Sequence, residues 1–401
     1  MRRARLVHAV ERALSFAFPS PGVRMDRLQQ LHDAGQSIWL DFIDRSLLRS
    51  GELARRIDRE ALTGMTSNPT IFEKALAEGQ AYDAQLAGAS PDLSAGELFE
   101  LVETDDVRAA CDIFRAVHEK TKGVDGYVSI EVSPGSANIV DDTIAEARRL
   151  WAVVERPNVM VKVPGTTAGA AAARRLLADG ININFTLLFA IEAHAAVIES
   201  YISALEERAK RGLPLSTIAS VASFFVSRVD TEAEKRLDAI VAATPARAEE
   251  AMVFRGRVAI ANAKLAYALF REKFSGARWE ALASRGARVQ RPLWASTSAK
   301  NPAYRDVVYV EDLIGPDTVN TMPPATIAAF ADHGVIKRTV DTNLDAERAL
   351  VANLEKFGVP LTGITDTLLR DGLASFGKSF DTLIAGLESK RRTLGAAVTA
   401  P

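Results

Sequence analysis

The decisive feature of this sequence is the stretch VMVKVP, residues 159–164. It is too short for a buried helix, and its β-branched residues and closing proline predict a parallel strand that is buried on both faces. Lys162 lies in the middle of this strand. Burial disfavours a charged ammonium and leaves the neutral amine, which is the nucleophile that forms a Schiff base with a carbonyl. The alternative is a structural lysine that snorkels to solvent or forms an ion pair. The strand alone does not decide between a catalytic and a structural role for Lys162.

Short apolar segments alternate with helical patterns from Gln36 onward, which is typical of a parallel sheet with helical crossovers. Eight such units in 401 residues predict a closed (β/α)₈ barrel, a TIM barrel in the α/β class. No G-x-G-x-x-G motif follows the first strand, which argues against a dinucleotide-binding sheet. The expected strands are residues 37–43, 62–67, 126–132, 159–164, 181–186, 217–224, 292–297 and 318–322.

A single catalytic domain is expected over residues 25–395. The connection after the sixth strand is long, and its alanine-rich residues 246–274 predict a helical insertion at about residues 230–288. One or two long helices from about Asp345 are expected to close the structure. Residues 1–24 carry five arginines and only a short apolar patch, which predicts a dispensable or disordered N-terminal extension, with a basic targeting segment as the alternative.

Composition excludes several classes of protein. A formal net charge of −2 with no basic segment in the main body argues against nucleic-acid binding. No apolar run approaches the roughly 20 residues of a membrane span. The one cysteine, Cys111, excludes an internal disulfide framework and indicates a reducing, cytoplasmic location. The five histidines are scattered, so no metal site is expected.

Polar side chains are expected to converge inside the barrel. Residues along a strand alternate between its faces, so Lys162 should face the lumen, opposite in parity to Val161 and Val163 and one layer above Met160. Polar residues near the C-terminal ends of four neighbouring strands should face the lumen as well. These are Asp41, Thr66 and Asn68, Ser129 and Glu131, and Asn182, Asn184 and Thr186.

Each of these residues alone has an ordinary structural explanation. Asn68, before Pro69, suits a turn cap, and Glu131 suits an ion pair with a loop lysine. Their convergence at the end of the barrel that carries catalytic groups predicts an active site with an amine nucleophile, two carboxylates, and amide and hydroxyl donors.

The late strands end in residues that suit an anion. SFFVSR (residues 223–228) closes the sixth strand and ASTSAKNP (residues 295–302) closes the seventh. Hydroxyls, an arginine and a lysine on adjacent loops are suited to a phosphate group, and the late strands of such barrels often bind one. Solvated loop charges are the alternative.

The segments quoted above resemble the transaldolases, in particular their long bacterial form. The similarity runs from about Gln29 to the final helices. The matching stretches are WLDFID (residues 39–44), TSNPTIF (66–72), VSIEV (128–132), VKVP (161–164), GININFTLLF (180–189) and SFFVSR (223–228).

The resemblance implies transfer of a dihydroxyacetone unit from a ketose phosphate (sedoheptulose 7-phosphate or fructose 6-phosphate) to an aldose phosphate (glyceraldehyde 3-phosphate or erythrose 4-phosphate), as in the non-oxidative pentose phosphate pathway, without cofactor or metal. By this resemblance, Lys162 forms the Schiff base and Asp41 removes the hydroxyl proton at the bond that breaks. Glu131, with Thr186 and a water molecule, moves protons during carbinolamine formation and dehydration.

The resemblance also implies the substrate contacts. Asn68, Asn184 and Ser223 are expected to bind the hydroxyls of the three-carbon unit, and Arg228, helped by Ser296, the phosphate. The sequence departs from shorter family members after Ser296, where Ser298 and Lys300 stand in place of an expected arginine. Lys300 is therefore the expected second cation. The full set of expected substrate-binding residues is Thr66, Asn68, Asn184, Ser223, Phe225, Arg228, Ser296, Ser298 and Lys300.

Two other functions fit part of this pattern. Another class I aldolase acting on fructose 6-phosphate shares the strand lysine, and a non-catalytic sugar-phosphate-binding barrel shares the fold. The polar fifth strand and Asp41 favour a transaldolase over a plain aldolase, and the presence of Lys162, Asp41 and Glu131 argues against a non-catalytic barrel. About 80 residues follow the eighth strand, too few for a fused isomerase domain. The expected partners are small sugar phosphates, with no nucleic acid or membrane, and the chain is expected to be a monomer or a homodimer.

Overall fold

A computed structural model of the chain describes residues 24–78 and 80–399. At its centre, eight parallel strands close into a barrel in sequential order. The predicted (β/α)₈ fold is therefore confirmed, and the predicted extension at residues 1–24 lies, but for Arg24, outside the described residues. The strands are β1 (Gln36–Asp41), β2 (Leu62–Thr66), β3 (Tyr127–Glu131), β4 (Val159–Pro164), β5 (Ile183–Leu188), β6 (Ser220–Phe225), β7 (Arg291–Ala295) and β8 (Thr318–Met322).

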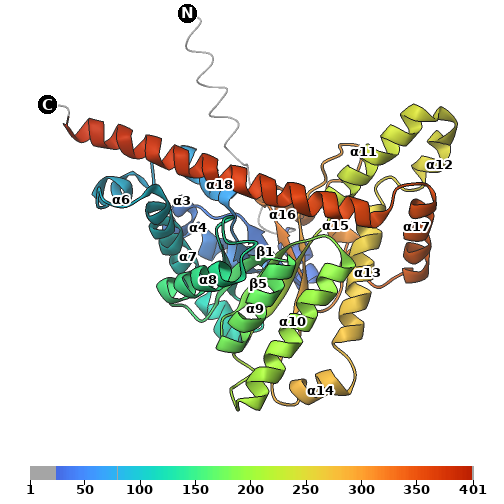
Figure 1. The fold of residues 1–401 in the computed structure, drawn as a ribbon, viewed down its shortest axis with the longest axis horizontal. Coiled ribbons are helices and arrows are strands. Elements are labelled where there is room, and N and C mark those ends of the chain that lie inside the picture. Colours follow the sequence, from blue (N-terminus) through green and yellow to red (C-terminus); the bar gives the residue numbers. More distant parts are fainter. Residues whose placement is uncertain (1–23, 79, 400–401) are drawn as a thin grey trace, which may run out of the picture.

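Helices surround this barrel (Figure 1). Among the described residues, none of them is long and apolar enough to cross a membrane. The helices are α2 (Arg24–Asp33), α3 (Arg45–Arg49), α4 (Glu52–Glu60), α5 (Pro69–Glu78), α6 (Asp83–Gly88), α7 (Ala95–Lys120), α8 (Val140–Val154), α9 (Thr167–Asp179), α10 (Ile191–Lys210), α11 (Ser227–Ala243), the 3-10 helix η1 (Pro245–Arg247), α12 (Ala248–Met252), α13 (Val258–Lys273), α14 (Ala277–Ala283), α15 (Val308–Glu311), α16 (Pro324–His333), α17 (Leu344–Lys356) and α18 (Leu361–Thr399).

The long connection after β6 is helical. Its helix α13 packs against β7 and α10 and so joins the layer around the barrel. Helices α11 and α12 project beyond that layer (Figure 1). The division of the chain into one domain with an insertion at about residues 230–288 stays a prediction.

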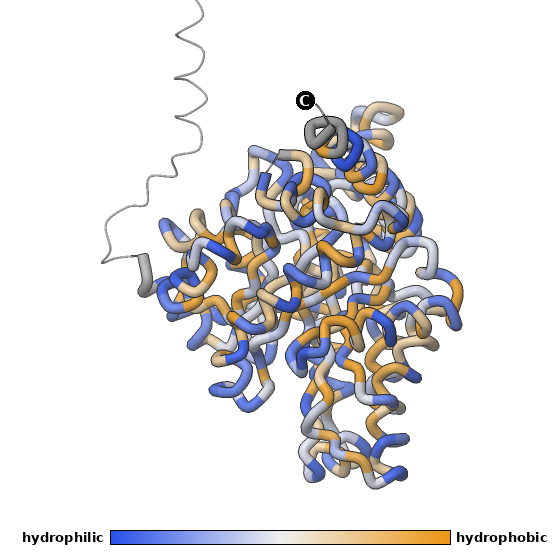
Figure 2. Tube along the Cα trace, turned by 90° about the vertical axis from the view of Figure 1, so that its left-hand side faces the viewer, coloured by the Kyte–Doolittle hydropathy of each residue, from blue (hydrophilic) through white to orange (hydrophobic). Residues whose placement is uncertain are grey.

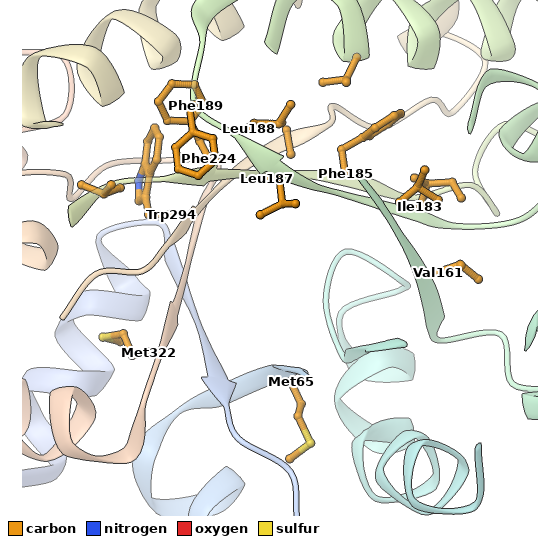
Figure 3. Close-up of a cluster of buried hydrophobic side chains, with 14 of the residues drawn as sticks. Met65, Val161, Ile183, Phe185, Leu187, Leu188, Phe189, Phe224, Trp294 and Met322 are labelled. Carbon is orange, nitrogen blue, oxygen red and sulfur yellow. The ribbon is translucent and has the colours of Figure 1, made fainter. Parts of the chain in front are cut away.

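Strand parity separates two apolar layers. The outward side chains of the strands pack under the helices, among them Val161, Phe185, Phe224 and Trp294 (Figure 3). The inward ones form a second cluster that fills the lumen, and it includes Trp39 and Met160. This is the arrangement that the alternation in the sequence predicts.

A glycine makes room for the largest side chain of the lumen. A Cβ atom on Gly64 would lie 2.5 Å from the indole of Trp39, which is itself fully buried. Only glycine allows Trp39 to lie across β2 at this level, so a substitution of Gly64 would displace the tryptophan or open the β1–β2 pairing.

A polar network closes the N-terminal end of the lumen. Asp125 accepts hydrogen bonds from Trp39 Nε1 at 2.7 Å and from the hydroxyl of Ser37. Arg291 donates to Ser37 Oγ at 2.7 Å and to the Val124 carbonyl at 2.9 Å, and its Nη1 lies 3.3 Å from Asp125 Oδ2. The charges at this end are thus held by one another and by neighbouring polar groups.

The last helix crosses the opposite, C-terminal end of the barrel (Figure 1). It packs on α5, α7 and α11. Figure 2 views this helix nearly end-on, beside the C label, with both hydrophilic and hydrophobic residues around its axis. It buries Ile364, Phe376 and Leu387. The sequence predicts long C-terminal helices but not that one of them roofs the barrel mouth.

Candidate active site

The C-terminal ends of the strands open into a cavity of about 400 Å³ under α18. Among the residues expected to act in catalysis or to bind substrate, all but Asn184 line it, whereas Ser129 and Asn182, which were also expected to face the lumen at this end, do not. The expected residues that line it are Asp41, Thr66, Asn68, Glu131, Lys162, Thr186, Ser223, Phe225, Arg228, Ser296, Ser298 and Lys300. Residues from seven strands or the loops after them thus meet at one place, as parity predicts.

Lys162 and Glu131 form a buried pair. They are opposite each other in the β3–β4 register, so both side chains enter the lumen at one level. Lys162 Nζ donates to Glu131 Oε2 at 2.8 Å and to the Ser67 carbonyl at 2.9 Å. Burial raises the pKa of Glu131, and the charge of Lys162 partly opposes that rise. A carboxyl group in this position is suited to take a proton from the amine and return it.

The second carboxylate stands on β1. Asp41 is opposite Thr66 in the register, and the Thr66 hydroxyl lies 2.9 Å from Asp41 Oδ1 and 2.6 Å from Thr321 Oγ1. Burial raises the pKa of Asp41, and the charge of Lys162 acts against it. One oxygen of Asp41 is therefore fixed by Thr66, and the other is available to a substrate hydroxyl.

Asn184 lies under the cavity rather than on its wall. Its Nδ2 donates to Ser129 Oγ at 3.0 Å, and its Oδ1 accepts from Ser223 Oγ at 2.6 Å. It orients Ser223, which does line the cavity. Thr186, two residues further along β5, lines the cavity, and its hydroxyl has no hydrogen-bond partner among the described residues.

Asn68 combines two positions. Its Oδ1 accepts from the Ile71 backbone N–H at 3.1 Å at the start of α5, which is the capping role named above as the structural alternative. The same residue lines the cavity, so its amide Nδ2 can still donate to a ligand.

Two cations meet at the β6–β7 side of the cavity. Arg228 lies with its guanidinium carbon 5.1 Å from the centre of the Phe225 ring, and Lys300 Nζ donates to Ser298 Oγ at 2.7 Å. Burial lowers the pKa of Arg228, and burial together with the nearby Arg228 charge lowers that of Lys300. Two cations that repel each other are suited to a shared dianion. Beside them, Ser296 has a left-handed backbone (φ 55°) and lines the same wall.

Some lining residues were missed by the sequence analysis. Thr321 has the inward parity of β8, so the same rule would have found it. Lys74 on α5 and the α18 residues Gly372, Ser375 and Phe376 carry no such signal, because only the folded chain brings their helices to the mouth.

Comparisons with known proteins identify the family to which the chain is similar. Residues 38–387 match the family model described as Transaldolase/Fructose-6-phosphate aldolase. A protein named transaldolase from Thermobifida fusca (strain YX) is 51% identical over 359 residues, which cover 89% of this chain and 96% of that protein. Transaldolases of Mycolicibacterium paratuberculosis and Trichodesmium erythraeum are 47% and 44% identical, each over 92% of this chain and 98% of the relative.

Proposed function

The chain belongs to the transaldolase family, and from this premise we propose how its residues divide the transfer of a dihydroxyacetone unit between two sugar phosphates. The observation that carries the proposal is the Lys162–Glu131 pair, 2.8 Å apart, in one cavity with Asp41 and two cations. That set supplies a nucleophile, two proton carriers and a phosphate site.

Schiff-base formation falls to Lys162 and Glu131. Glu131 takes a proton from the ammonium, and the free amine attacks the ketose carbonyl to give a carbinolamine. Glu131 then returns a proton to the carbinolamine hydroxyl, which leaves as water. Burial raises the pKa of Glu131, which makes it a better proton acceptor than an ordinary glutamate. Thr186, with its unpartnered hydroxyl, would hold the water.

Cleavage of the carbon–carbon bond falls to Asp41. It removes the proton of the hydroxyl next to the breaking bond, and the electrons flow into the iminium on Lys162. The iminium is the electron sink, so the reaction needs no metal or organic cofactor. The aldose leaves, and the three-carbon unit stays bound until an acceptor aldose phosphate reverses these steps.

The remaining residues hold the substrate. We assign the hydroxyls of the three-carbon unit to Asn68 and Ser223, with Asn184 orienting Ser223 from below. Arg228 and Lys300 hold the phosphate with the hydroxyls of Ser296 and Ser298. Lys300 takes the place of the arginine that shorter family members carry.

Trapping with borohydride tests this assignment. Incubation with fructose 6-phosphate and borohydride should leave a reduced three-carbon adduct, and peptide mass spectrometry should locate it on Lys162. Lys300, which lines the same cavity, is the internal control. An adduct on Lys300 with Lys162 unmodified would refute the assignment.

Location and assembly are proposed separately. A single cysteine, buried at Cys111, suits the reducing cytoplasm. A monomer or homodimer is expected, and light scattering after size exclusion would give a mass of one or two chains of 43.3 kDa.

A further inference from the structure

A second cavity lies behind the active site. It has a volume of about 480 Å³ and is bounded by residues of α7, α8 and α18. Glu131 is the one described residue that lines both cavities, so it borders the substrate pocket and this space alike. The charged residues of the second cavity are Glu97, Glu100, Glu103, Glu131, Glu146 and Arg149.

Four of these five carboxylates have a partner. Glu97 accepts from the Ser94 backbone N–H at 2.8 Å, and Glu146 from that of Ser133 at 3.0 Å. Glu100 pairs with Arg149 at 2.7 Å. Glu131 pairs with Lys162, as described above.

Glu103 is the exception. It is only 5% exposed, and among the described residues it has no hydrogen-bond or ion-pair partner. It lies on α7 between Phe99 and Val107, four residues away on either side, so it belongs to the face of the helix that is turned toward the barrel. A buried carboxylate with no partner is costly, whereas a carboxylic acid that donates to water in a polar cavity is not.

The charges around Glu103 also favour the protonated form. Burial raises its pKa well above the ordinary value, and Glu131 of β3, Glu146 of α8 and Glu100 of α7 raise it further. Lys162 of β4 acts in the opposite direction. Arg149 is engaged by Glu100, and α18 contributes the uncharged Phe380 to this cavity.

We propose that Glu103 is a positioning residue that relays protons to and from Glu131 through water in the second cavity. The inference rests on the proposed function, because it gives Glu131 its proton-carrying role. The oxygen of the ketose carbonyl needs two protons to leave as water, and Glu131 carries only one at a time. Glu131 first gives the oxygen the proton that it took from the Lys162 ammonium and becomes a carboxylate. Glu103 then passes its proton through water to Glu131, which gives it to the departing hydroxyl. The second proton of the attacking amine returns through water to Glu103, so both acids end in their starting states and no proton is consumed.

The variant Glu103→Gln tests the relay, since glutamine has the shape of the protonated acid but cannot exchange its proton. Iminium formation on Lys162, measured by rapid borohydride quench with fructose 6-phosphate, should slow at least about 10-fold, less than the ~10²–10⁴-fold of a direct proton carrier. In the wild type this rate should fall as the pH rises through the raised pKa of Glu103, and the variant should lose that limb. Glu97→Gln, in the same cavity and helix but not among the charges that raise the pKa of Glu103, is the matched control and should keep the wild-type rate and profile.

A double variant separates a relay from a packing effect. Because Glu103 acts through Glu131, Glu103→Gln combined with Glu131→Gln should be no slower than Glu131→Gln alone. Additive losses, or a wild-type rate and pH profile in Glu103→Gln, would overturn the relay.

Should Glu103→Gln fail to fold, Glu103→Asp takes its place. This variant keeps a titrating acid and must retain the fall in rate at alkaline pH, and loss of that fall would also overturn the relay. If the wild type itself formed no adduct on Lys162, the proposed function would fail and the relay with it.

Discussion

Buried charges occur at both ends of this barrel, and the two ends differ in what surrounds them. At the N-terminal end, Arg291 and Asp125 are held by Ser37 and Trp39, which are themselves buried. At the C-terminal end, Lys162 and Glu131 hold each other but face a cavity of about 400 Å³. The network at the N-terminal end makes its hydrogen bonds within the protein. The pair at the C-terminal end can also form hydrogen bonds with a ligand in the cavity.

The difference shows that burial of a charge does not by itself indicate function. Arg291 begins one barrel strand and Lys162 lies inside another, and both are at most 8% exposed. What marks Lys162 is access to a cavity together with raised pKa values of the acids beside it, Asp41 and Glu131. Substitutions at the two ends should therefore separate activity from stability.

The largest effect is expected at Lys162. In Lys162→Met the nucleophile is lost, and turnover should fall by at least about 10⁴-fold, the scale of losses when a covalent nucleophile is removed. Glu131 can then bind a proton or water from either cavity. The free energy of unfolding in urea should therefore differ from that of the wild type by less than about 2 kcal/mol. Measurable Schiff-base turnover in this variant would remove the distinction between the two ends.

Variants of the two carboxylates at the C-terminal end should be blocked at different steps of the reaction. Asp41→Asn and Glu131→Gln should each lower turnover by about 10²–10⁴-fold. With borohydride, Asp41→Asn should trap the intact ketose on Lys162, because only cleavage is blocked, whereas Glu131→Gln should trap little at short times. Equal trapping in both variants would show that the roles are not divided.

The same pair fixes a pH dependence. Cleavage requires ionised Asp41, and burial raises the pKa of this residue. The single-turnover cleavage rate should therefore rise with pH, and the rise should occur at a higher pH than the pKa of an ordinary aspartate would give. Asp41→Asn should lack this rise in the residual rate.

Loss of Arg291 should act on stability instead. Arg291→Met leaves Asp125 buried without a cation, and breaking a buried pair costs about 3–5 kcal/mol. Urea unfolding measures this loss, while turnover per folded molecule should stay within about 3-fold of the wild type because the substrate pocket is at the other end. A large drop in turnover without a change in stability would contradict the assignment of a structural role to the N-terminal end and a catalytic role to the C-terminal end.

Strand parity explains why much of the site was predictable. The alternation along VMVKVP and the neighbouring strands placed Lys162, Glu131 and Asp41 on one side of a barrel before any contact was known. Parity did not reveal the second cavity, because Glu103 lies on a helix. Its signal, an acid between Phe99 and Val107 on the apolar face of α7, is local and gives no hint that the face packs behind Glu131.

The position of α18 over the pocket could not be predicted from the sequence for a different reason. Gly372 approaches Leu187 so closely that a Cβ atom would lie 3.3 Å from a Leu187 methyl group, although the two residues are far apart in the chain. Leu187 itself has a left-handed backbone (φ 56°), which local propensity does not predict. Such contacts depend on how α18 packs across the barrel, and no periodic pattern encodes that path.

The smallest effect is expected at Asp44, three residues after Asp41 in the same motif. The sequence gives both residues a carboxylate, but their parity is opposite, and Asp44 does not line the cavity. It caps α3 instead, where its Oδ1 accepts from the Leu47 backbone N–H at 2.8 Å. Asp44→Ala should therefore cost about 1 kcal/mol of unfolding free energy, as for other lost N-caps, and leave turnover within about 2-fold. Turnover and urea unfolding of Asp44→Ala, measured beside those of Asp41→Asn, would check this at the level of single residues. A loss of turnover as deep as that of Asp41→Asn would mean that the loop after β1, and not strand parity, places the base.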